Sequence, residues 1–402
     1  MIYVFYFFSV VLIYLSYRSL TGGIAYLRYF REQSLRQPSD QTPAVTVFAP
    51  CRGKDPGLSG NLEALLSQDL PNYEVIFVVD DHADDSAEVI ENVIRSHKDI
   101  AAKLIVAPKA VNCSQKVENL REAVLHADKD TTVFVFVDSD VRPASSWLRS
   151  LIGPLEDQAV GAATGYRWFI SKRRNFGSEM RSCWNASIAS ALGPNTSSNF
   201  CWGGSMAVRR EVFEGLNVRE KWKGSLSDDF TLTRTINAAG LPIVFVPQAL
   251  SASLEDCSFG EMLEFTTRQM KITRVYAPQL WAMSFFGSTL FNAVLIAALL
   301  IAVINRSNTF AVWFSLAVIL AVVVLSVGKA WLRMKAVELV LKEHRELIRR
   351  QYLAQNTLWI LIPAVFLYNS IDALFSRRMT WRGTSYLLKS PFETVIIADK
   401  EK

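Results

Sequence analysis

Three pairs of aspartates in this sequence are placed where they could bind a cation or move a proton. Each pair stands at the end of an apolar run or at the start of a helical pattern. The pairs are Asp80 with Asp81, Asp138 with Asp140, and Asp228 with Asp229. Carboxylates are ligands of hard divalent cations and are also common general bases. We therefore expect metal binding or proton transfer at one or more of these pairs.

The pair formed by Asp138 and Asp140 has the strongest chemical signal. Five apolar residues, VFVFV, lead directly into Asp-Ser-Asp. Two carboxylates one residue apart at the end of a buried strand repel each other unless a cation joins them. Oxygen ligands of this kind suit Mg²⁺ or Mn²⁺, which complete their shells from a diphosphate. The sequence therefore predicts a divalent metal site at these two residues.

The other two pairs leave a structural alternative open, because aspartate is also common at helix N-termini and in turns. Ser227 or Asp228 could cap the helix that the segment DDFTLTRTINAAG predicts. Asp81 is as consistent with a turn after the run VIFVV as with a ligand.

These aspartates need a scaffold that brings strand ends together. From residue 44 to residue 250, short β-branched runs alternate with helical patterns, which indicates an α/β domain with a mostly parallel sheet. The expected strands are 45–48, 74–79, 103–106, 132–137, 159–165 and 243–246, and the expected helices include 58–67, 86–96 and 116–127. Ligands of such sheets bind beyond the carboxyl ends of the strands.

Composition excludes several classes of protein. Half of the 402 residues are apolar and only 20% are charged, so the chain is neither disordered, nor collagen-like, nor a highly charged coiled coil. The net charge of +5 is too small to indicate nucleic-acid binding. The five cysteines form no C-x-x-C pair, so neither a disulfide framework nor a zinc ribbon is expected.

Apolar segments at both ends predict a membrane protein. No charge precedes Arg18, and the runs 280–303 and 309–327 are long enough to span a bilayer, with the loop INRSN between them. A fourth run, 357–375, contains Pro363, Asn369 and Asp372, which fits either a span with polar contacts or a partly inserted segment. Because basic loops face the cytoplasm, residues 18–36 place the central domain there. The same rule favours partial insertion of the fourth run.

The acidic clusters in this order resemble the inverting family 2 glycosyltransferases with the GT-A fold. More narrowly, the sequence resembles ceramide glucosyltransferase and its bacterial relatives, such as the hopanoid glycosyltransferases. It depends on the segment RGKDPGLSGNLEALLSQDLPNYEVIFVVDDHADD at 52–85, together with CWGGSMAVRREVF, SDDFTL and TWRG-x-x-Y. It covers nearly the whole chain.

The resemblance implies a role for four of the aspartates. Asp81 matches the family aspartate that contacts the uridine of the donor. Asp138 and Asp140 match the metal and diphosphate site. Asp229 matches the catalytic base, which takes the proton of the acceptor hydroxyl as that hydroxyl attacks the anomeric carbon. Asp140 completes a D-x-D pair from which ceramide enzymes often depart.

The family's fourth motif, (Gln or Arg)-x-x-Arg-Trp, falls on residues 268–272, where Lys271 replaces Arg and Ile272 replaces Trp. On a helix, Arg268, Lys271 and Arg274 lie close to one face and could bind the donor diphosphate. A basic turn that flanks the membrane is an equal alternative.

Other residues also leave two interpretations open. Lys116 and Asn119 could approach the donor or mark the exposed start of a helix. Arg167, Trp168 and Trp202 could line the mouth of an acceptor site, or the aromatic rings could pack in the core.

The resemblance and the apolar segments together define seven expected parts. They are an N-terminal membrane anchor (1–20), a basic juxtamembrane segment (21–43), a cytoplasmic glycosyltransferase domain (44–279), a transmembrane hairpin (280–327), an interfacial amphipathic helix (328–352), a further membrane segment (353–376) and a basic tail (377–402).

The leading hypothesis is an integral membrane enzyme that moves a hexose such as glucose from a UDP-sugar to the hydroxyl of a lipid in the bilayer. It would use Mn²⁺ or Mg²⁺ and would bind no nucleic acid. The alternatives are a processive polysaccharide synthase and a non-catalytic membrane protein that binds a nucleotide sugar.

Overall fold

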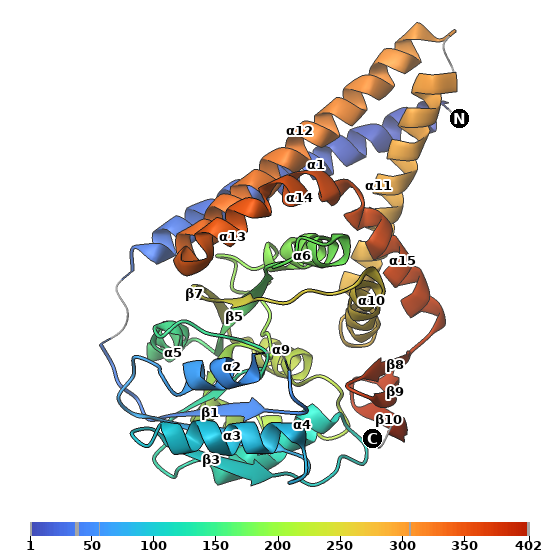
Figure 1. The fold of residues 1–402 in the computed structure, drawn as a ribbon. Coiled ribbons are helices and arrows are strands. Elements are labelled where there is room, and N and C mark those ends of the chain that lie inside the picture. The colour runs from blue at the N-terminus through green and yellow to red at the C-terminus, as the bar shows by residue number, and fades with distance from the viewer. Residues whose placement is uncertain (1, 37–39, 56, 305–306, 400–402) are drawn as a thin grey trace. The chain divides into compact units, whose positions relative to one another are not determined.

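The computed structural model describes residues 2–36, 40–55, 57–304 and 307–399 of the chain (Figure 1). Parts of the predicted anchor, juxtamembrane segment, hairpin loop and basic tail, as well as Pro56 of the 52–85 segment, lie outside these ranges. The chain folds into two compact units. One comprises Met1–Arg31, Phe169–Ser190 and Leu254–Ser376, and the other comprises Glu32–Trp168, Ala191–Ser253 and Arg377–Lys402. We refer to them as the helical unit and the sheet unit.

The sheet unit is built on seven strands in the order β3-β2-β1-β4-β6-β5-β7. The strands are β1 (Val45–Pro50), β2 (Tyr73–Val79), β3 (Ala101–Val106), β4 (Val133–Phe136), β5 (Ala162–Phe169), β6 (Met206–Arg209) and β7 (Ile243–Ser253). Strands β3, β2, β1 and β4 pair in parallel, whereas β6 pairs antiparallel with both β4 and β5. The predicted α/β class with a mostly parallel sheet is confirmed.

All six predicted strands are present, but β6 was not predicted. Its four residues, MAVR, are too few to show a period of two or a long apolar run. Only its pairing with β4 and β5 identifies it as a strand.

Alternating side chains on the strands build one apolar core on each face of the sheet. On β4, Val133 and Val135 pack on one face with α2 (Leu58–Leu65), α3 (Asp85–Ser96) and α5 (Trp147–Ile152). Phe134 and Phe136 pack on the other face with α4 (Gln115–Ala123), α7 (Arg210–Gly215), α8 (Val218–Lys221) and α9 (Asp228–Ala238). The 3-10 turns η1 (Val124–His126) and η2 (Gly153–Glu156) follow α4 and α5. Because both faces are covered, only the strand ends and loops can hold polar chemistry.

The predicted basic tail forms a small antiparallel sheet, β10-β9-β8, within the sheet unit. Its strands are β8 (Arg378–Trp381), β9 (Thr384–Ser390) and β10 (Glu393–Asp399). The turn between β8 and β9 has positive φ at Arg382 (48°) and Gly383 (84°), as in the primed turns that suit hairpins. The carbonyl of Phe392 lies so close to Gly224 that a Cβ there would clash, which shows how tightly the small sheet packs.

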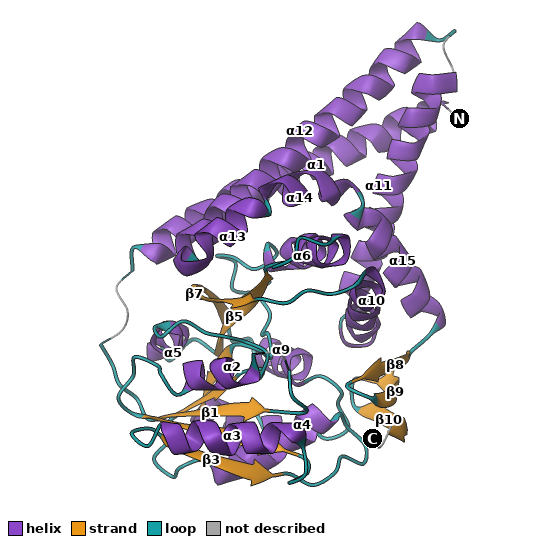
Figure 2. Ribbon diagram, viewed as in Figure 1, coloured by secondary structure: helices purple, strands orange, loops and turns teal. Residues whose placement is uncertain are grey.

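Helices, which are purple in Figure 2, make up most of the described part of the helical unit. The helices are α1 (Ile2–Ser34), α6 (Phe176–Ala189), α10 (Phe259–Tyr276), α11 (Pro278–Ile304), α12 (Thr309–Val340), α13 (Arg345–Arg350), α14 (Tyr352–Thr357) and α15 (Ile362–Phe375), with the 3-10 turns η3 (Lys342–His344) and η4 (Leu358–Ile360). Helices α1, α11 and α12 are long and apolar enough to cross a membrane. Residues Tyr352–Ile360 and Ile362–Phe375 form a pair bent by 56°, which is either a broken span or a re-entrant segment. The number of candidate spans is therefore three or four among the described residues.

The predicted interfacial segment 328–352 is divided among several elements. Helix α12 continues without a break to Val340, and η3 and α13 follow it. Gly328 does not end α12, whose C-cap is Leu341. Arg333 lies on the buried side of this extension and donates a hydrogen bond to Gln355 at 3.0 Å.

Candidate functional site

A cluster of charged side chains from several elements lies beyond the carboxyl end of β4. Asp138 and Asp140 follow that strand, Lys116 lies on α4, Arg167 lies on β5, and Asp228 opens α9. The apolar run of β4 is buried between the two cores, and Asp138 follows directly where this run ends. The aspartates therefore lie outside the cores, at the carboxyl end of the strand. We call the five side chains, together with Asp229, the acid cluster. The second and third aspartate pairs therefore lie in one cluster, through Lys116.

Arg167 joins the two carboxylates of the Asp-x-Asp pair. Its Nη2 lies 3.1 Å from Asp138 Oδ2 and 3.4 Å from Asp140 Oδ1, and its Nη1 lies 3.2 Å from Asp140 Oδ2. The guanidinium also lies over the ring of Trp202, 4.7 Å from its centroid. Arg167 and Trp202 are therefore part of this site, whereas Trp168 is fully buried in the core.

Lys116 joins the second and third aspartate pairs. Its Nζ lies 2.7 Å from Asp138 Oδ1 and 3.1 Å from Asp228 Oδ1. Its side chain is only 15% exposed, so the interpretation as an exposed helix start is wrong. No local pattern favoured the other interpretation, because a lysine in the first turn of a helix is ordinary.

Burial and charge shift the pKa values in the cluster in different directions. Burial alone would lower the pKa of Lys116, but the neighbouring carboxylates raise it above its usual value. Burial alone would raise the pKa of Asp138, but Lys116 and Arg167 hold it below its usual value. For Asp228 burial outweighs Lys116 and raises the pKa to about 6. Asp228 Oδ2 is buried and accepts no hydrogen bond from the described residues.

Asp229 is held at the start of α9 by its own hydrogen bonds. Its Oδ1 accepts the N–H of Phe230 at 2.7 Å and the hydroxyl hydrogen of Ser227, and its Oδ2 accepts the N–H of Gly203 at 3.2 Å. The N-cap of α9 is Ser227, whose side chain accepts the N–H of Phe230. The capping alternative therefore applies to Ser227, and Asp228 is instead engaged by Lys116.

Gly203 lets the chain approach the acid cluster. A Cβ at this position would lie 2.5 Å from Asp228 Oδ2 and 2.7 Å from Lys116 Nζ. Any larger residue would push these two groups aside, which explains the glycine in the CWGG segment.

The first aspartate pair divides into a buried and an exposed residue. Asp80 is buried and pairs with Lys109 at 3.1 Å. Asp81 has a side chain 55% exposed, and its Oδ1 accepts the N–H of Ala83 at 2.9 Å. This hydrogen bond is the turn interaction that the sequence left open, and a part in donor binding stays a prediction.

Arg382 is a charged residue near Asp138 and Asp140 that was not among the predicted site residues. Its two terminal nitrogens donate to Asp55 at 2.9 and 2.7 Å, and Nη1 also donates to the carbonyl of Arg52. Burial lowers the pKa of Arg382, but Asp55, Asp140 and Asp138 raise it above its usual value. Its position in the quoted TWRG segment was the available signal.

Two of the carboxylates suit a divalent metal. Among the described residues no group of three or more His, Cys, Asp or Glu side chains could hold a metal ion. Asp138 and Asp140 nevertheless direct oxygens toward one shared cation, which here is Arg167. One or two carboxylates completed by substrate phosphates are a usual ligand set for Mg²⁺. These residues therefore fit the predicted Mg²⁺ or Mn²⁺ ion if a diphosphate supplies the other ligands.

Arg268 and Lys271 lie on α10 in the helical unit. Lys271 Nζ lies 2.8 Å from Asp372 Oδ2 of α15, and Arg268 lies over the ring of Phe265. Arg274 donates to the carbonyls of Ala373 and Leu374. The contacts of Lys271 and Arg274 join α10 to α15, whereas that of Arg268 lies within α10. A role of Arg268 and Lys271 in diphosphate binding stays a prediction.

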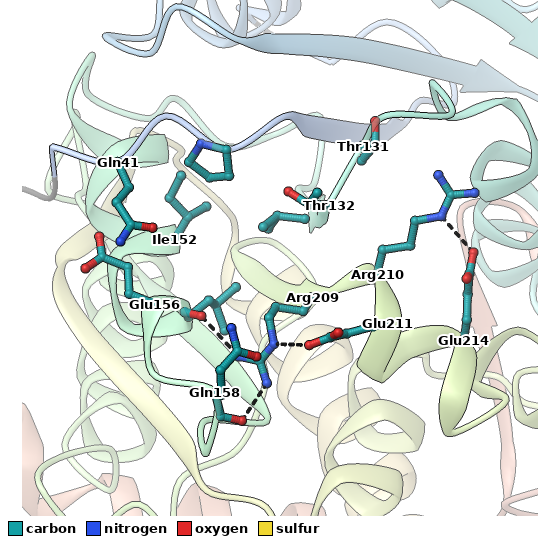
Figure 3. A pocket seen from close by; sticks show the side chains of 13 residues that line it. Gln41, Thr131, Thr132, Ile152, Glu156, Gln158, Arg209, Arg210, Glu211 and Glu214 are labelled. Carbon is teal, nitrogen blue, oxygen red and sulfur yellow. Dashed lines mark hydrogen bonds and ion pairs between the residues drawn. The ribbon is translucent and has the colours of Figure 1, made fainter.

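A pocket of about 490 Å³ lies at the amino end of β4, the end opposite the acid cluster (Figure 3). Its two arginines are already engaged. Arg209 donates to the carbonyl of Gln158 at 2.8 Å and pairs with Glu211, and Arg210 pairs with Glu214 at 2.8 Å. The pocket therefore offers no unsatisfied charge for a phosphate.

A family model described as Glycosyl transferase family 21 matches residues 6–392. The chain belongs to this family. The match covers both compact units, so the resemblance drawn from the acidic segments is confirmed.

Curated relatives match shorter parts of the chain. Ceramide glucosyltransferase 1 from Caenorhabditis elegans is 30% identical over 87 residues, which is 22% of this chain and 19% of that enzyme. Hyaluronan synthase from Streptococcus pyogenes is 30% identical over 143 residues, which is 35% of this chain and 33% of that enzyme. The chain thus spans about a fifth of the length of the first of these relatives.

A solved structure is similar over most of the chain. It is a mannosyltransferase from Pyrobaculum calidifontis in complex with GDP-Man and Mn²⁺, with 18% identity and a TM-score of 0.47. The similarity covers 92% of this chain and 99% of that chain.

Proposed function

We propose that this family 21 member is an inverting hexosyltransferase that moves glucose or a related hexose from a UDP-sugar to the hydroxyl of a membrane lipid, ceramide or a hopanoid. The observation that carries the proposal is the acid cluster, which places four carboxylates and two cations at the carboxyl end of the sheet. The match to ceramide glucosyltransferases supports the sugar and lipid classes. The apolar helices support an acceptor in the bilayer.

Asp229 is the proposed general base. Three hydrogen bonds fix its carboxylate, which is the requirement for a base that must meet one hydroxyl. As the acceptor oxygen forms a bond to the anomeric carbon, its proton passes to Asp229 and the bond from that carbon to UDP breaks. A single displacement of this kind inverts the configuration of the anomeric carbon.

The leaving diphosphate gains negative charge as this bond breaks, and the cluster holds the cations that can stabilise it. Lys116 and Arg167 are both mostly buried, so their charges act in a medium of low dielectric constant. A divalent ion bound by Asp138 and Asp140 would supply further stabilisation of the diphosphate. Asp81, at the end of β2, would contact the uridine.

The placement in the membrane is part of the same proposal. The basic residues that follow the first apolar run support a sheet unit that faces the cytoplasm. Arg268 and Lys271 would contact the donor diphosphate.

The test is transfer of labelled sugar from UDP-glucose, UDP-galactose and UDP-N-acetylglucosamine into an organic-extractable lipid, by membranes that contain the protein. Asp229→Asn should abolish the label. Asp130→Asn is the matched control, because Asp130 is an exposed aspartate ahead of β4, at its other end. UDP binding without transfer from any donor would instead favour the non-catalytic alternative.

A processive polysaccharide synthase is the second candidate, because hyaluronan synthase matches a third of this chain. The two candidates differ in product size. A ladder or a polymer on a gel would overturn the lipid proposal, whereas one sugar per lipid by mass spectrometry would support it.

A further inference from the structure

Every carboxylate oxygen of the Asp-x-Asp pair already faces a positive charge from the protein. Asp138 Oδ1 is paired with Lys116, and Asp138 Oδ2 is paired with Arg167. Both oxygens of Asp140 lie within 3.4 Å of the guanidinium of Arg167. The residues that would hold a metal are therefore engaged by cations that belong to the chain.

Arg167 and a shared metal ion would compete for the same position. The Nη2 atom lies between Asp138 Oδ2 and Asp140 Oδ1, at 3.1 and 3.4 Å. A divalent ion held by the same two oxygens would need the space that Nη2 fills. The nitrogen and the ion cannot occupy this space together, and their positive charges repel each other.

The position of Arg167 also allows it to exchange partners. Its guanidinium also lies over the ring of Trp202, 4.7 Å from the centroid, so it has a second partner besides the carboxylates. A planar guanidinium binds phosphate oxygens in the same forked geometry as carboxylate oxygens. A diphosphate that arrives at the cluster can therefore take the guanidinium from the carboxylates.

We propose that Arg167 is a positioning residue that couples metal binding to nucleotide binding. Without nucleotide it holds Asp138 and Asp140 together and opposes metal binding. When the diphosphate arrives, Arg167 pairs with it and leaves the two carboxylates to the metal. The inference rests on the proposed function, because it requires a diphosphate ligand.

The experiment measures Mn²⁺ affinity of the detergent-solubilised full chain, with and without UDP, by calorimetry or by electron paramagnetic resonance. Arg167→Gln should bind Mn²⁺ roughly tenfold more tightly than the wild type when UDP is absent, and the gain in Mn²⁺ affinity caused by UDP should shrink by a similar factor. A residue that only supports the fold would not raise metal affinity when replaced. Unchanged or weaker Mn²⁺ binding by Arg167→Gln without UDP would overturn the inference.

Three further variants keep the result interpretable. Arg167→Lys keeps the positive charge but loses the forked geometry, so we expect a smaller increase in Mn²⁺ affinity than in Arg167→Gln. No increase in Arg167→Gln or in Arg167→Lys would overturn the inference. Arg210→Gln removes an arginine from an ion pair at the other end of β4 and should leave Mn²⁺ affinity unchanged. Asp140→Asn should abolish tight Mn²⁺ binding. If the wild type binds no UDP with any metal, the proposed function itself fails.

Discussion

Arg382 and Asp55 form a forked ion pair, with N···O distances of 2.9 and 2.7 Å, although 327 residues separate them in the chain. The pair attaches the turn between β8 and β9 to the loop that follows β1. Arg52 extends this attachment, because its Nη1 donates to Thr384 at 3.1 Å. The C-terminal sheet is therefore held at the loop that begins the 52–85 segment.

We expect this pair to stabilise the attachment of the C-terminal sheet. The two side chains are 35% and 25% exposed, so a double-mutant cycle with Arg382→Ala and Asp55→Ala should give a coupling energy of only ~0.5–1 kcal/mol in unfolding experiments. Limited proteolysis after residue 377 should become faster in both single variants. Equal cleavage rates in the wild type and both variants would contradict the role of the pair.

Asp228 should make stability depend on pH in a defined window. Burial raises its pKa to about 6, so the folded protein binds a proton that the unfolded chain has lost. This contribution is complete below the ordinary pKa near 3.8 and is lost as the pH rises through about 6. The unfolding temperature of the wild type, relative to that of Asp228→Asn in the same EDTA buffer, should therefore fall from about pH 4 to pH 6. A constant difference across this window would show that the pKa is not raised.

Gly203→Ala should damage the site through a single methyl group. The added Cβ would meet Asp228 Oδ2 and Lys116 Nζ, and the displacement should cost about 1–3 kcal/mol of stability. The rate of sugar transfer should fall by more than the loss of stability alone would cause. The reason is that the same shift moves the backbone N–H of Gly203, which donates to Asp229. Gly215→Ala is the matched control, since nothing lies within 4 Å of its added Cβ. Full activity of Gly203→Ala would show that the cluster tolerates the shift.

Lys271 and Asp372 distinguish a ligand role from a structural role for α10. If Lys271 binds the donor, Lys271→Ala should raise the KM for the UDP-sugar about tenfold, while Asp372→Asn leaves it nearly unchanged. If their 2.8 Å ion pair only joins α10 to α15, both variants should lower the unfolding temperature and neither should change the KM. We expect the first result.

Patterns along the chain determined the fold class and the position of the acids. Val133, Val135 and Val137 alternate with Phe134 and Phe136, and this period places them in separate cores on the two faces of the sheet. An apolar run that ends in Asp138 must end where the sheet meets polar surroundings. The candidate membrane spans could be predicted in the same way, from the length of uninterrupted apolar sequence. Each of these features depends on neighbouring residues, so each can be read locally.

Which cations meet those acids depends on how distant parts of the chain fold together. Arg167 lies 27 and 29 residues from Asp140 and Asp138, and the antiparallel strand β6, which pairs with both β4 and β5, links their strands. Lys116 reaches Asp228 because α4 and α9 pack on the same face of the sheet. A single lysine or arginine has no periodic pattern of its own, and its charge is satisfied by whatever the strand order brings within about 4 Å. The sequence alone therefore determined the acidic half of the site, and the topology of the sheet decided the basic half.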